Sequence, residues 1–395
     1  MSFRRVAIGT VVAIAFLVPV LPATWRTFHG FMLVARAVAP HDVVRALARL
    51  DAVDVKERLL VAPVGGASML ARAYVPAAQG RPRQTVLLVS GLHPAGIDEP
   101  RLIHLSRTLA ESNVLVVTPD IPELSRFDIT THVTDRIEAA AVWLALESGF
   151  APDGRIGLMG VSFSGGLAVV AAGRPSLRGR LRYVFSFGGH DDLRLVLDHF
   201  CAGGLVDPSD EAGLPEKAAP SAPHDYGVAI ALLTVAEHLV PPEQLTDFKG
   251  AVRRFLSASY LDRTDKDRAD GEFAALRGVA LSMPEPSATL LTYVNARDVA
   301  QLGARLRRSV GAYAETAGLS PARSPLPGVP VFLLHGRDDT VIPAAESQRL
   351  AERLRGRTHV RLLLTDLISH ADADQPAHTA DVLRLAAFWG DVLSR

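Results

Sequence analysis

GVSFSGG, residues Gly160–Gly166, is the stretch that decides the fold. The apolar run Ile156–Gly160 leads into it and predicts a strand, while Gly165–Ala172 predicts a helix directly after it. A serine between a strand and a helix sits on a sharp, strained turn, and small neighbours let the two elements approach closely. The stretch therefore predicts a strand–turn–helix unit that exposes a nucleophilic serine hydroxyl.

Two registers of this turn are open. Ser162 has Gly160 two residues before it and Ser164 two residues after it, where glycine is commoner. The other register takes Ser164 as the nucleophile, flanked by Ser162 and Gly166. We favour Ser162 because it follows the strand directly. Taken alone, the motif would fit a Gly/Ser-rich turn without chemistry equally well.

Around the turn, short apolar strands alternate with helices. The runs Arg58–Ala62 and Met69–Val75 predict an antiparallel opening pair. The further predicted strands are Thr85–Ser90, Val114–Val117, Ile156–Gly160, Tyr183–Phe187, Val331–Leu334 and His359–Thr365, and the predicted helices are Leu102–Glu111, Asp135–Leu146, Gly165–Ala172, Ala344–Leu354 and Thr379–Leu393. This alternation indicates an α/β protein with a mostly parallel central sheet and helices on both faces.

The alternation stops near Gly188. Residues 193–324 carry many helical windows and several prolines but no convincing strand, and a Pro-rich linker, SPLPGVP, follows from Ser324. We therefore expect a helical cap insertion at 193–324 that interrupts a core formed by 57–192 and 325–395.

An acid and a histidine follow the late strands. HGRDDTVIP, residues His335–Pro343, places Asp339 on the loop after one strand, with Asp338 as the alternative. His370 follows the last strand, and His378, beside the closing helix, competes with it. The order Ser162, Asp339, His370 is the order expected on such a sheet. An imidazole activates the serine hydroxyl, and a carboxylate orients the imidazole and stabilises its cation.

Such a reaction needs hydrogen-bond donors for a developing oxyanion. One expected donor is the backbone N–H of Phe163, and the second comes from the loop Gly91–Gly96, with Leu92 slightly ahead of His93. His93 could instead be a structural loop histidine. Likewise, the segment His190-Asp191-Asp192 could be functional or a polar strand end leading into the cap.

Composition narrows the function classes. The chain has 395 residues, with 42 Lys+Arg and 42 Asp+Glu, so no basic surplus suggests a nucleic-acid partner. The single cysteine, Cys201, cannot form an intramolecular disulfide, and we interpret it as a buried or idle thiol. The sequence contains no HExxH signature, so we expect no catalytic metal, and it contains no phosphate-binding glycine loop.

The N-terminal segment has features of a membrane-targeting signal. Arg4 and Arg5 precede the apolar run Val6–Val18, which is short of the roughly 20 residues of a spanning helix. We expect 1–25 to be a signal anchor or signal peptide, and 26–56 an amphipathic juxtamembrane helix that lies next to the membrane or on the domain. The catalytic domain would then lie outside the cytoplasm, with the membrane as a partner. A buried N-terminal helix is the alternative.

The chain resembles the α/β-hydrolase superfamily, in its esterase, lipase and dienelactone-hydrolase-like branches. GVSFSGG, HGRDDTVIP and ISHAD carry the resemblance, which covers roughly 57–192 and 326–395. It implies an eight-stranded sheet and acyl transfer through an acyl-Ser162 intermediate without a cofactor. The expected function is hydrolysis of carboxylic esters with a hydrophobic acyl group. A peptidase or amidase with the same triad, or a catalytically silent binding protein, is the alternative.

Overall fold

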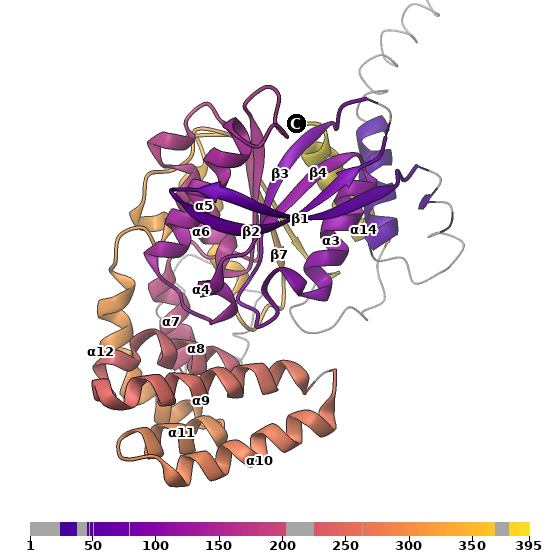
Figure 1. Cartoon of the computed structure of the whole chain (residues 1–395). Helices are drawn as coiled ribbons and strands as arrows, with labels where there is room; N and C mark the ends of the chain where they lie inside the picture. The colour runs from indigo at the N-terminus through magenta and orange to yellow at the C-terminus, as the bar shows by residue number, and fades with distance from the viewer. Residues whose placement is uncertain are drawn as a thin grey trace, which may run out of the picture.

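The chain forms one eight-stranded sheet with helices on both faces (Figure 1). The computed structural model describes residues 24–37, 46, 48–49, 51–78, 80–202, 225–262, 264–367 and 379–395. The strands are β1 (Val55–Val64), β2 (Ala67–Pro76), β3 (Gln84–Val89), β4 (Val114–Pro119), β5 (Ile156–Val161), β6 (Leu181–Phe187), β7 (Val331–Gly336) and β8 (Val360–Thr365). Their spatial order is β1-β2-β4-β3-β5-β6-β7-β8.

Strand direction brings the chemistry to one edge. β1 pairs with β2, and β2 with β4, in antiparallel fashion, whereas every other pairing is parallel. The register sets Val161 beside Phe187 and Phe187 beside Leu334, and Gly336 lies beside Thr365. The carboxyl ends of β5 to β8 therefore lie along the same edge of the sheet. The predicted fold class, a mostly parallel α/β sheet, is confirmed.

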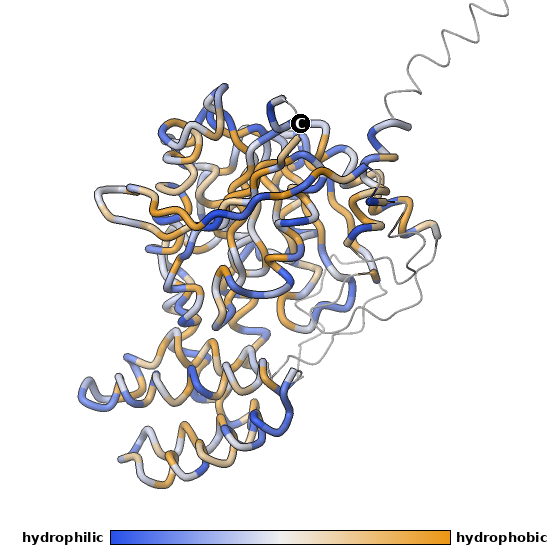
Figure 2. The backbone as a smooth tube through the Cα atoms, turned by 45° about the vertical axis from the view of Figure 1, so that its right-hand side comes forward, coloured by the Kyte–Doolittle hydropathy of each residue, from blue (hydrophilic) through white to orange (hydrophobic). Residues whose placement is uncertain are grey.

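Both faces of the sheet are apolar. In β3, Val86 and Leu88 point into one core while Leu87 and Val89 point into the other, as the two-residue period of a strand requires. α3 (Pro100–Glu111), α14 (Thr379–Leu393) and a helix at 24–37 cover the first face. α5 (Thr131–Leu146), α6 (Phe163–Ala172) and α13 (Ala344–Leu354) cover the second. Figure 2 shows the hydrophobic strands enclosed within these layers.

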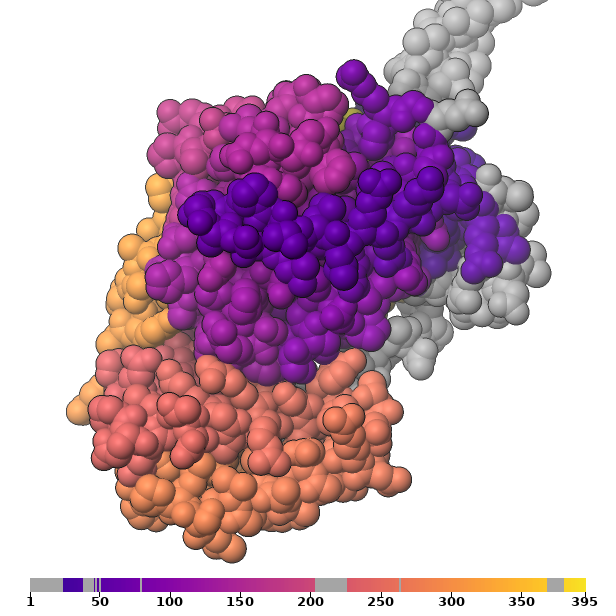
Figure 3. Space-filling view, viewed as in Figure 1, coloured from indigo at the N-terminus to yellow at the C-terminus, as the bar shows by residue number. Residues whose placement is uncertain are grey.

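Between β6 and β7 the chain is helical. The helices of this segment, called the helical insertion (193–324), are α7 (Leu193–Cys201), α8 (Asp225–Val235), α9 (Pro242–Leu261), α10 (Lys266–Ser282), α11 (Ser287–Asn295) and α12 (Val299–Ala314). α12 packs on α7 and α8, and α9 packs on α10 and α11. Figure 3 shows this segment lying directly against the rest of the molecule. Shorter elements are α4 (Pro122–Ser125), η1 (Gly96–Asp98), η2 (Pro175–Leu177), η4 (Ala236–His238) and η5 (Pro321–Arg323).

The helix at 24–37 is docked on the body, against α14. A Cβ at Gly30 would lie 1.8 Å from the carbonyl oxygen of Ala386, and one at Gly390 would lie 2.3 Å from that of Arg26. The two helices thus touch backbone to backbone, and the apolar side chain of Leu33 is buried beneath them. We predicted an amphipathic helix over 26–56, next to a membrane or on the domain. The helix at 24–37 lies on the domain, with its apolar face against α14.

The predicted membrane location is corrected. Within the described parts of the chain, no helix is both long enough and apolar enough to cross a membrane. The prediction of a membrane-anchored protein is therefore wrong for the part of the chain that the structure describes. Residues 1–23, which carry the predicted signal segment, lie outside the described residues.

Candidate active site

Ser162 occupies the turn between β5 and α6. Its backbone has φ of 56° and ψ of −132°, a conformation that costs a non-glycine residue free energy and persists only where the surroundings impose it. The Ser162 N–H donates to the carbonyl of Phe187 (2.7 Å), and its own carbonyl accepts from the N–H of Gly165 (2.7 Å). A Cβ at Gly160 would lie only 2.1 Å from the carbonyl oxygen of Ser164, so this crossing requires glycine.

The two serines of the turn differ in environment. Ser164 is fully buried in α6, and its hydroxyl donates to the carbonyl of Ser90, the residue after β3. Ser162 is partly exposed at the carboxyl end of the sheet. A serine that is buried and already hydrogen-bonded is poorly placed to attack a substrate. This contrast favours Ser162 over Ser164 as the nucleophile.

The loop after β3 lies against Ser162. A Cβ at Gly91 would be 3.3 Å from the Cβ of Ser162. The N–H of His93 donates to the carbonyl of Leu124 (3.3 Å), which leaves it unavailable to an oxyanion. The N–H of Leu92 has no hydrogen-bond partner among the described residues. Phe163 begins α6, where N–H groups have no acceptor within the helix. Of the three expected donors, Leu92 and Phe163 therefore fit.

The His93 side chain is held in a fixed orientation. Its Nδ1 accepts from the N–H of Ala95 (3.1 Å), and only 8% of the residue is exposed. Burial lowers the pKa of His93 to about 4; the charge of Glu99 opposes this shift and that of Arg101 adds to it. The imidazole is therefore neutral near pH 7, with its proton on Nε2.

The acid loop after β7 presents Asp339. This residue is buried, and its Oδ1 accepts from the N–H groups of Val341 (2.8 Å) and Ile342 (3.0 Å). Its Oδ2 lies 3.3 Å from Nε2 of His335, whose ring is held by Ser347 and by the carbonyl of Ile342. The alternative acid, Asp338, is exposed. Asp339 is thus the oriented carboxylate of this loop.

The predicted histidine lies outside the described residues. His370 and its competitor His378 both fall within 368–378. The structure therefore places Ser162 and Asp339 on loops that follow β5 and β7 at one edge of the sheet. It does not describe His370, the third residue of the predicted triad. β8 ends at Thr365, beside Gly336 and thus next to the acid loop.

His199 in α7 was missed by the sequence reasoning. Burial lowers its pKa, while a hydrogen bond to the backbone of Thr340 and the charge of Asp339 oppose this shift. Its Nε2 is buried and has no hydrogen-bond partner among the described residues. No motif could have indicated His199, because helix packing alone brings it to the acid loop. It is a second candidate for the base.

The segment after β6 is structural. His190 is fully buried, and its Nε2 donates to the carbonyl of Leu319 (2.8 Å). Asp191 is also fully buried and pairs with Arg353 through contacts of 2.9–3.2 Å. The carboxylate of Glu346 accepts from the N–H groups of Asp191 (2.9 Å) and Asp192 (2.8 Å). This network joins the start of the helical insertion to α13.

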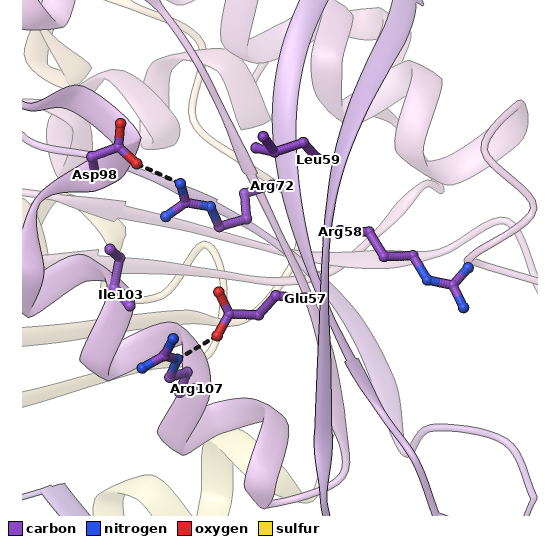
Figure 4. A pocket seen from close by; sticks show the side chains of 7 residues that line it. All are labelled: Glu57, Arg58, Leu59, Arg72, Asp98, Ile103 and Arg107. Atoms are coloured by element: carbon purple, nitrogen blue, oxygen red, sulfur yellow. Dashed lines mark hydrogen bonds and ion pairs between the residues drawn. The ribbon is translucent and has the colours of Figure 1, made fainter.

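Two other features lack catalytic character. Cys201 is buried, and burial raises the pKa of its thiol to about 12, so it is not a thiolate near pH 7. A surface hollow of about 380 Å³ lies beside the β1–β2 hairpin. In it Arg72 pairs with Asp98 and Arg107 with Glu57, as Figure 4 shows. Carboxylates thus neutralise two of the three arginines that line the hollow, and Arg58 is the third.

Comparisons with known proteins give matches among solved structures. No protein-family model matches the sequence, and no curated protein matches it. An esterase from Pyrobaculum calidifontis is 16% identical over 94% of this chain and 92% of that chain, with a TM-score of 0.47. A thermostable esterase from Pseudomonas putida is 16% identical over 89% and 88%, with a TM-score of 0.44. An acylaminoacyl peptidase from Pyrococcus horikoshii is 12% identical over 86% of this chain and 41% of that chain, with a TM-score of 0.42. This chain thus spans less than half the length of that peptidase.

The fold itself rests on the molecule's own topology. The strand order, the antiparallel β2 beside β4 and the serine turn after β5 are those of the α/β-hydrolase superfamily, and the chain has that fold.

Proposed function

We propose that the protein is a serine hydrolase that cleaves carboxylic esters through an acyl-Ser162 intermediate. The observation that carries the proposal is the strained Ser162 turn, set beside the loop of Leu92, whose N–H has no partner among the described residues. A fold alone does not define an activity, but this pairing of a partly exposed hydroxyl with two backbone donors suits acyl transfer.

The proposed reaction has two steps. Ser162 Oγ attacks the ester carbonyl while the imidazole of His370, oriented by Asp339, takes its proton. The N–H groups of Phe163 and Leu92 stabilise the oxyanion. The imidazolium then protonates the departing alcohol, which leaves acyl-Ser162. Water, deprotonated by the same imidazole, attacks the acyl group, and the acid and free Ser162 result.

The helical insertion supports a hydrophobic acyl substrate. α9 reaches the loops after β3 and β4, where Tyr260 packs against His93 and Arg253 donates to the carbonyl of Arg126 (2.9 Å). We propose that the insertion is a cap that covers Ser162, excludes water and selects the acyl group. A peptidase or amidase activity would use the same residues, so esters and matched amides should be compared.

The test is covalent labelling with a fluorophosphonate probe, followed by hydrolysis of p-nitrophenyl esters. Wild type should be labelled, and Ser162→Ala should lose all labelling. Ser164→Ala is the matched control: it removes a structural hydrogen bond but should still be labelled. If only Ser164→Ala abolishes labelling, the register is wrong.

A second comparison identifies the base. His370→Ala should lower kcat by at least about 10³-fold, as expected for loss of a triad member. His199→Ala should retain activity within about tenfold of wild type. The reverse pattern would assign the base to His199 instead. A wild-type protein that neither labels nor hydrolyses any ester would refute the proposed function.

A further inference from the structure

A ring contact joins the helical insertion to the loop beside Ser162. The imidazole of His93 and the phenol ring of Tyr260 lie 4.3 Å apart between centroids, at 87° to one another. His93 belongs to the loop after β3, whereas Tyr260 lies in the last turn of α9. Edge-to-face ring pairs of this kind are favourable beyond the area they bury.

On the loop side, His93 is coupled to its backbone. The ring accepts the N–H of Ala95, and the His93 N–H donates to the carbonyl of Leu124. Leu92, whose N–H meets no acceptor in the part of the chain that the structure describes, comes directly before it. A displacement of the His93 ring therefore moves the peptide unit between Leu92 and His93. Through the Leu92 Cα it also turns the preceding unit, between Gly91 and Leu92, which carries the Leu92 N–H.

On the helix side, α9 is held by the body. Arg253 donates to the carbonyl of Arg126 (2.9 Å) and pairs with Asp128 (2.8 Å), both on the loop after β4. Phe255 of the same helix is buried in the core that extends from the sheet into the insertion. The position of Tyr260 is thus set by contacts on two sides.

We propose that Tyr260 is a positioning residue, which through His93 holds the Leu92 N–H in the orientation that stabilises the oxyanion. The inference rests on the proposed function, since it assigns a role to a residue of the insertion in that same site. An oxyanion donor must lie about 2.7–3.1 Å from the oxygen, so a small shift of this loop costs rate more than binding. The ring of His93 is neutral near pH 7, so the contact depends on packing and not on charge.

The kinetic test compares Tyr260→Ala with Tyr260→Phe, using p-nitrophenyl butyrate. Tyr260→Phe keeps the ring and should match wild type within about twofold. Tyr260→Ala should lower kcat about 2- to 10-fold, the range that corresponds to the worth of one ring pair, with KM changed less than twofold. A change in KM alone would make Tyr260 a wall of the substrate site and would overturn the proposal.

A double-variant cycle adds specificity. His93→Asn keeps a side-chain acceptor for the Ala95 N–H but lacks the ring, so it should resemble Tyr260→Ala. The double variant should lose no more activity than either single variant, because both remove the same contact. Fully additive losses would show that the two residues act separately and would overturn the proposal.

A second measurement does not depend on activity. Amide hydrogen exchange of the peptide covering 88–99 should be faster in Tyr260→Ala by about 2- to 10-fold, and unchanged in Tyr260→Phe. Equal exchange in all three proteins would refute the coupling even if Ser162 reacts normally. Conversely, faster exchange in a protein that never reacts with the probe would uphold the coupling and refute the proposed function.

Discussion

Ser162 holds a backbone conformation that few residues other than glycine adopt, and its neighbours compensate for the strain. The N–H of Ser162 is bonded to Phe187 on the next strand, and its carbonyl to Gly165 in the following turn. Gly160 permits the close crossing of β5 and α6 that makes the turn this sharp. Strain of this kind is held at functional sites when the surrounding contacts over-determine it.

Gly160→Ala should disrupt this turn. The added Cβ would lie 2.1 Å from the Ser164 carbonyl oxygen, a contact that only a backbone shift can relieve. We expect the free energy of unfolding to fall by about 1–3 kcal/mol and probe labelling to be lost. Gly250→Ala is the control, since a Cβ there meets nothing within 4 Å. Denaturant unfolding and labelling rate are the measurements, and a Gly160→Ala protein labelled at the wild-type rate would contradict the account.

His93 should make stability depend on pH in the acid range. Its pKa is lowered to about 4 by burial, from an ordinary value of about 6.5, so the folded state resists a proton that the unfolded state accepts. The stabilisation is therefore complete above pH 6.5 and is lost as the pH falls through 4. Between pH 7 and pH 4, wild type should lose about 2–3 kcal/mol more than His93→Asn does. Equal losses, measured by urea unfolding at each pH, would show that His93 does not contribute.

The sequence could predict which residues of the loops carry candidate site groups, but it could not predict which hydrogen bonds those residues make. Asp339 was found because an acid after an apolar strand is a local pattern. His93 was expected as a backbone donor, yet its N–H is taken by Leu124, which lies on the loop after β4. His199 reaches the acid loop only through the packing of α7. Such partners are set by tertiary structure, and no local motif records them.

At the scale of elements, apolar runs and helical periodicity were sufficient to predict the strands and helices of the core. The predicted helix Ala344–Leu354 has the bounds of α13, and the predicted strand His359–Thr365 differs from β8 by one residue. The N-terminal helix was predicted next to a membrane or on the domain, because an amphipathic pattern shows that one face of a helix is covered but not what covers it. In the structure, α14 covers it.

The crossing of α14 with the helix at 24–37 gives a prediction. Gly390→Ala would place a Cβ 2.3 Å from the carbonyl oxygen of Arg26, so the two helices must separate. We expect the free energy of unfolding to fall by about 1–3 kcal/mol and cleavage by trypsin near Arg26 to accelerate. Gly278→Ala in α10 is the matched control, since its Cβ meets nothing within 4 Å, and it should stabilise by about 0.5–1 kcal/mol. Unchanged stability of Gly390→Ala would mean that this docking contributes nothing.

The ion pair between Asp191, on the loop after β6, and Arg353 of α13 gives another prediction. Arg353→Met leaves the fully buried Asp191 without its cation, and uncompensated buried charges are costly. We expect a loss of about 3 kcal/mol in the free energy of unfolding. Arg384→Met, which breaks the exposed pair with Asp381, should cost less than about 0.5 kcal/mol. Similar losses in the two variants would contradict the buried character of the Asp191 pair.

Over the whole molecule, the sheet separates two hydrophobic cores, and one of them extends beyond the sheet into the helical insertion. Alternate residues of each central strand enter opposite cores, so every strand belongs to both. The core on the α5–α6 side continues through α7 and α8 into α9, where it includes Phe255. The other core lies beneath α3 and α14 and includes Phe388. The helical insertion is thus packed as part of the body, as the proposed cap requires if it is to keep a fixed contact with the loop beside Ser162.

This continuity predicts a single unfolding transition. Phe255 is 1% exposed and Phe388 is fully buried, so truncation of either to alanine should cost about 3–5 kcal/mol through lost burial and the cavity left behind. Because the strands connect the two cores, both variants should lower the same melting temperature, by about 4–8 °C in a chain of this size. Differential scanning calorimetry measures both the shift and the number of transitions. If Phe255→Ala moved one of two resolved transitions and Phe388→Ala moved the other, the insertion would be an independent unit. In that case the insertion could unfold while the sheet stayed folded, and the contact between Tyr260 and His93 would then no longer hold the loop after β3.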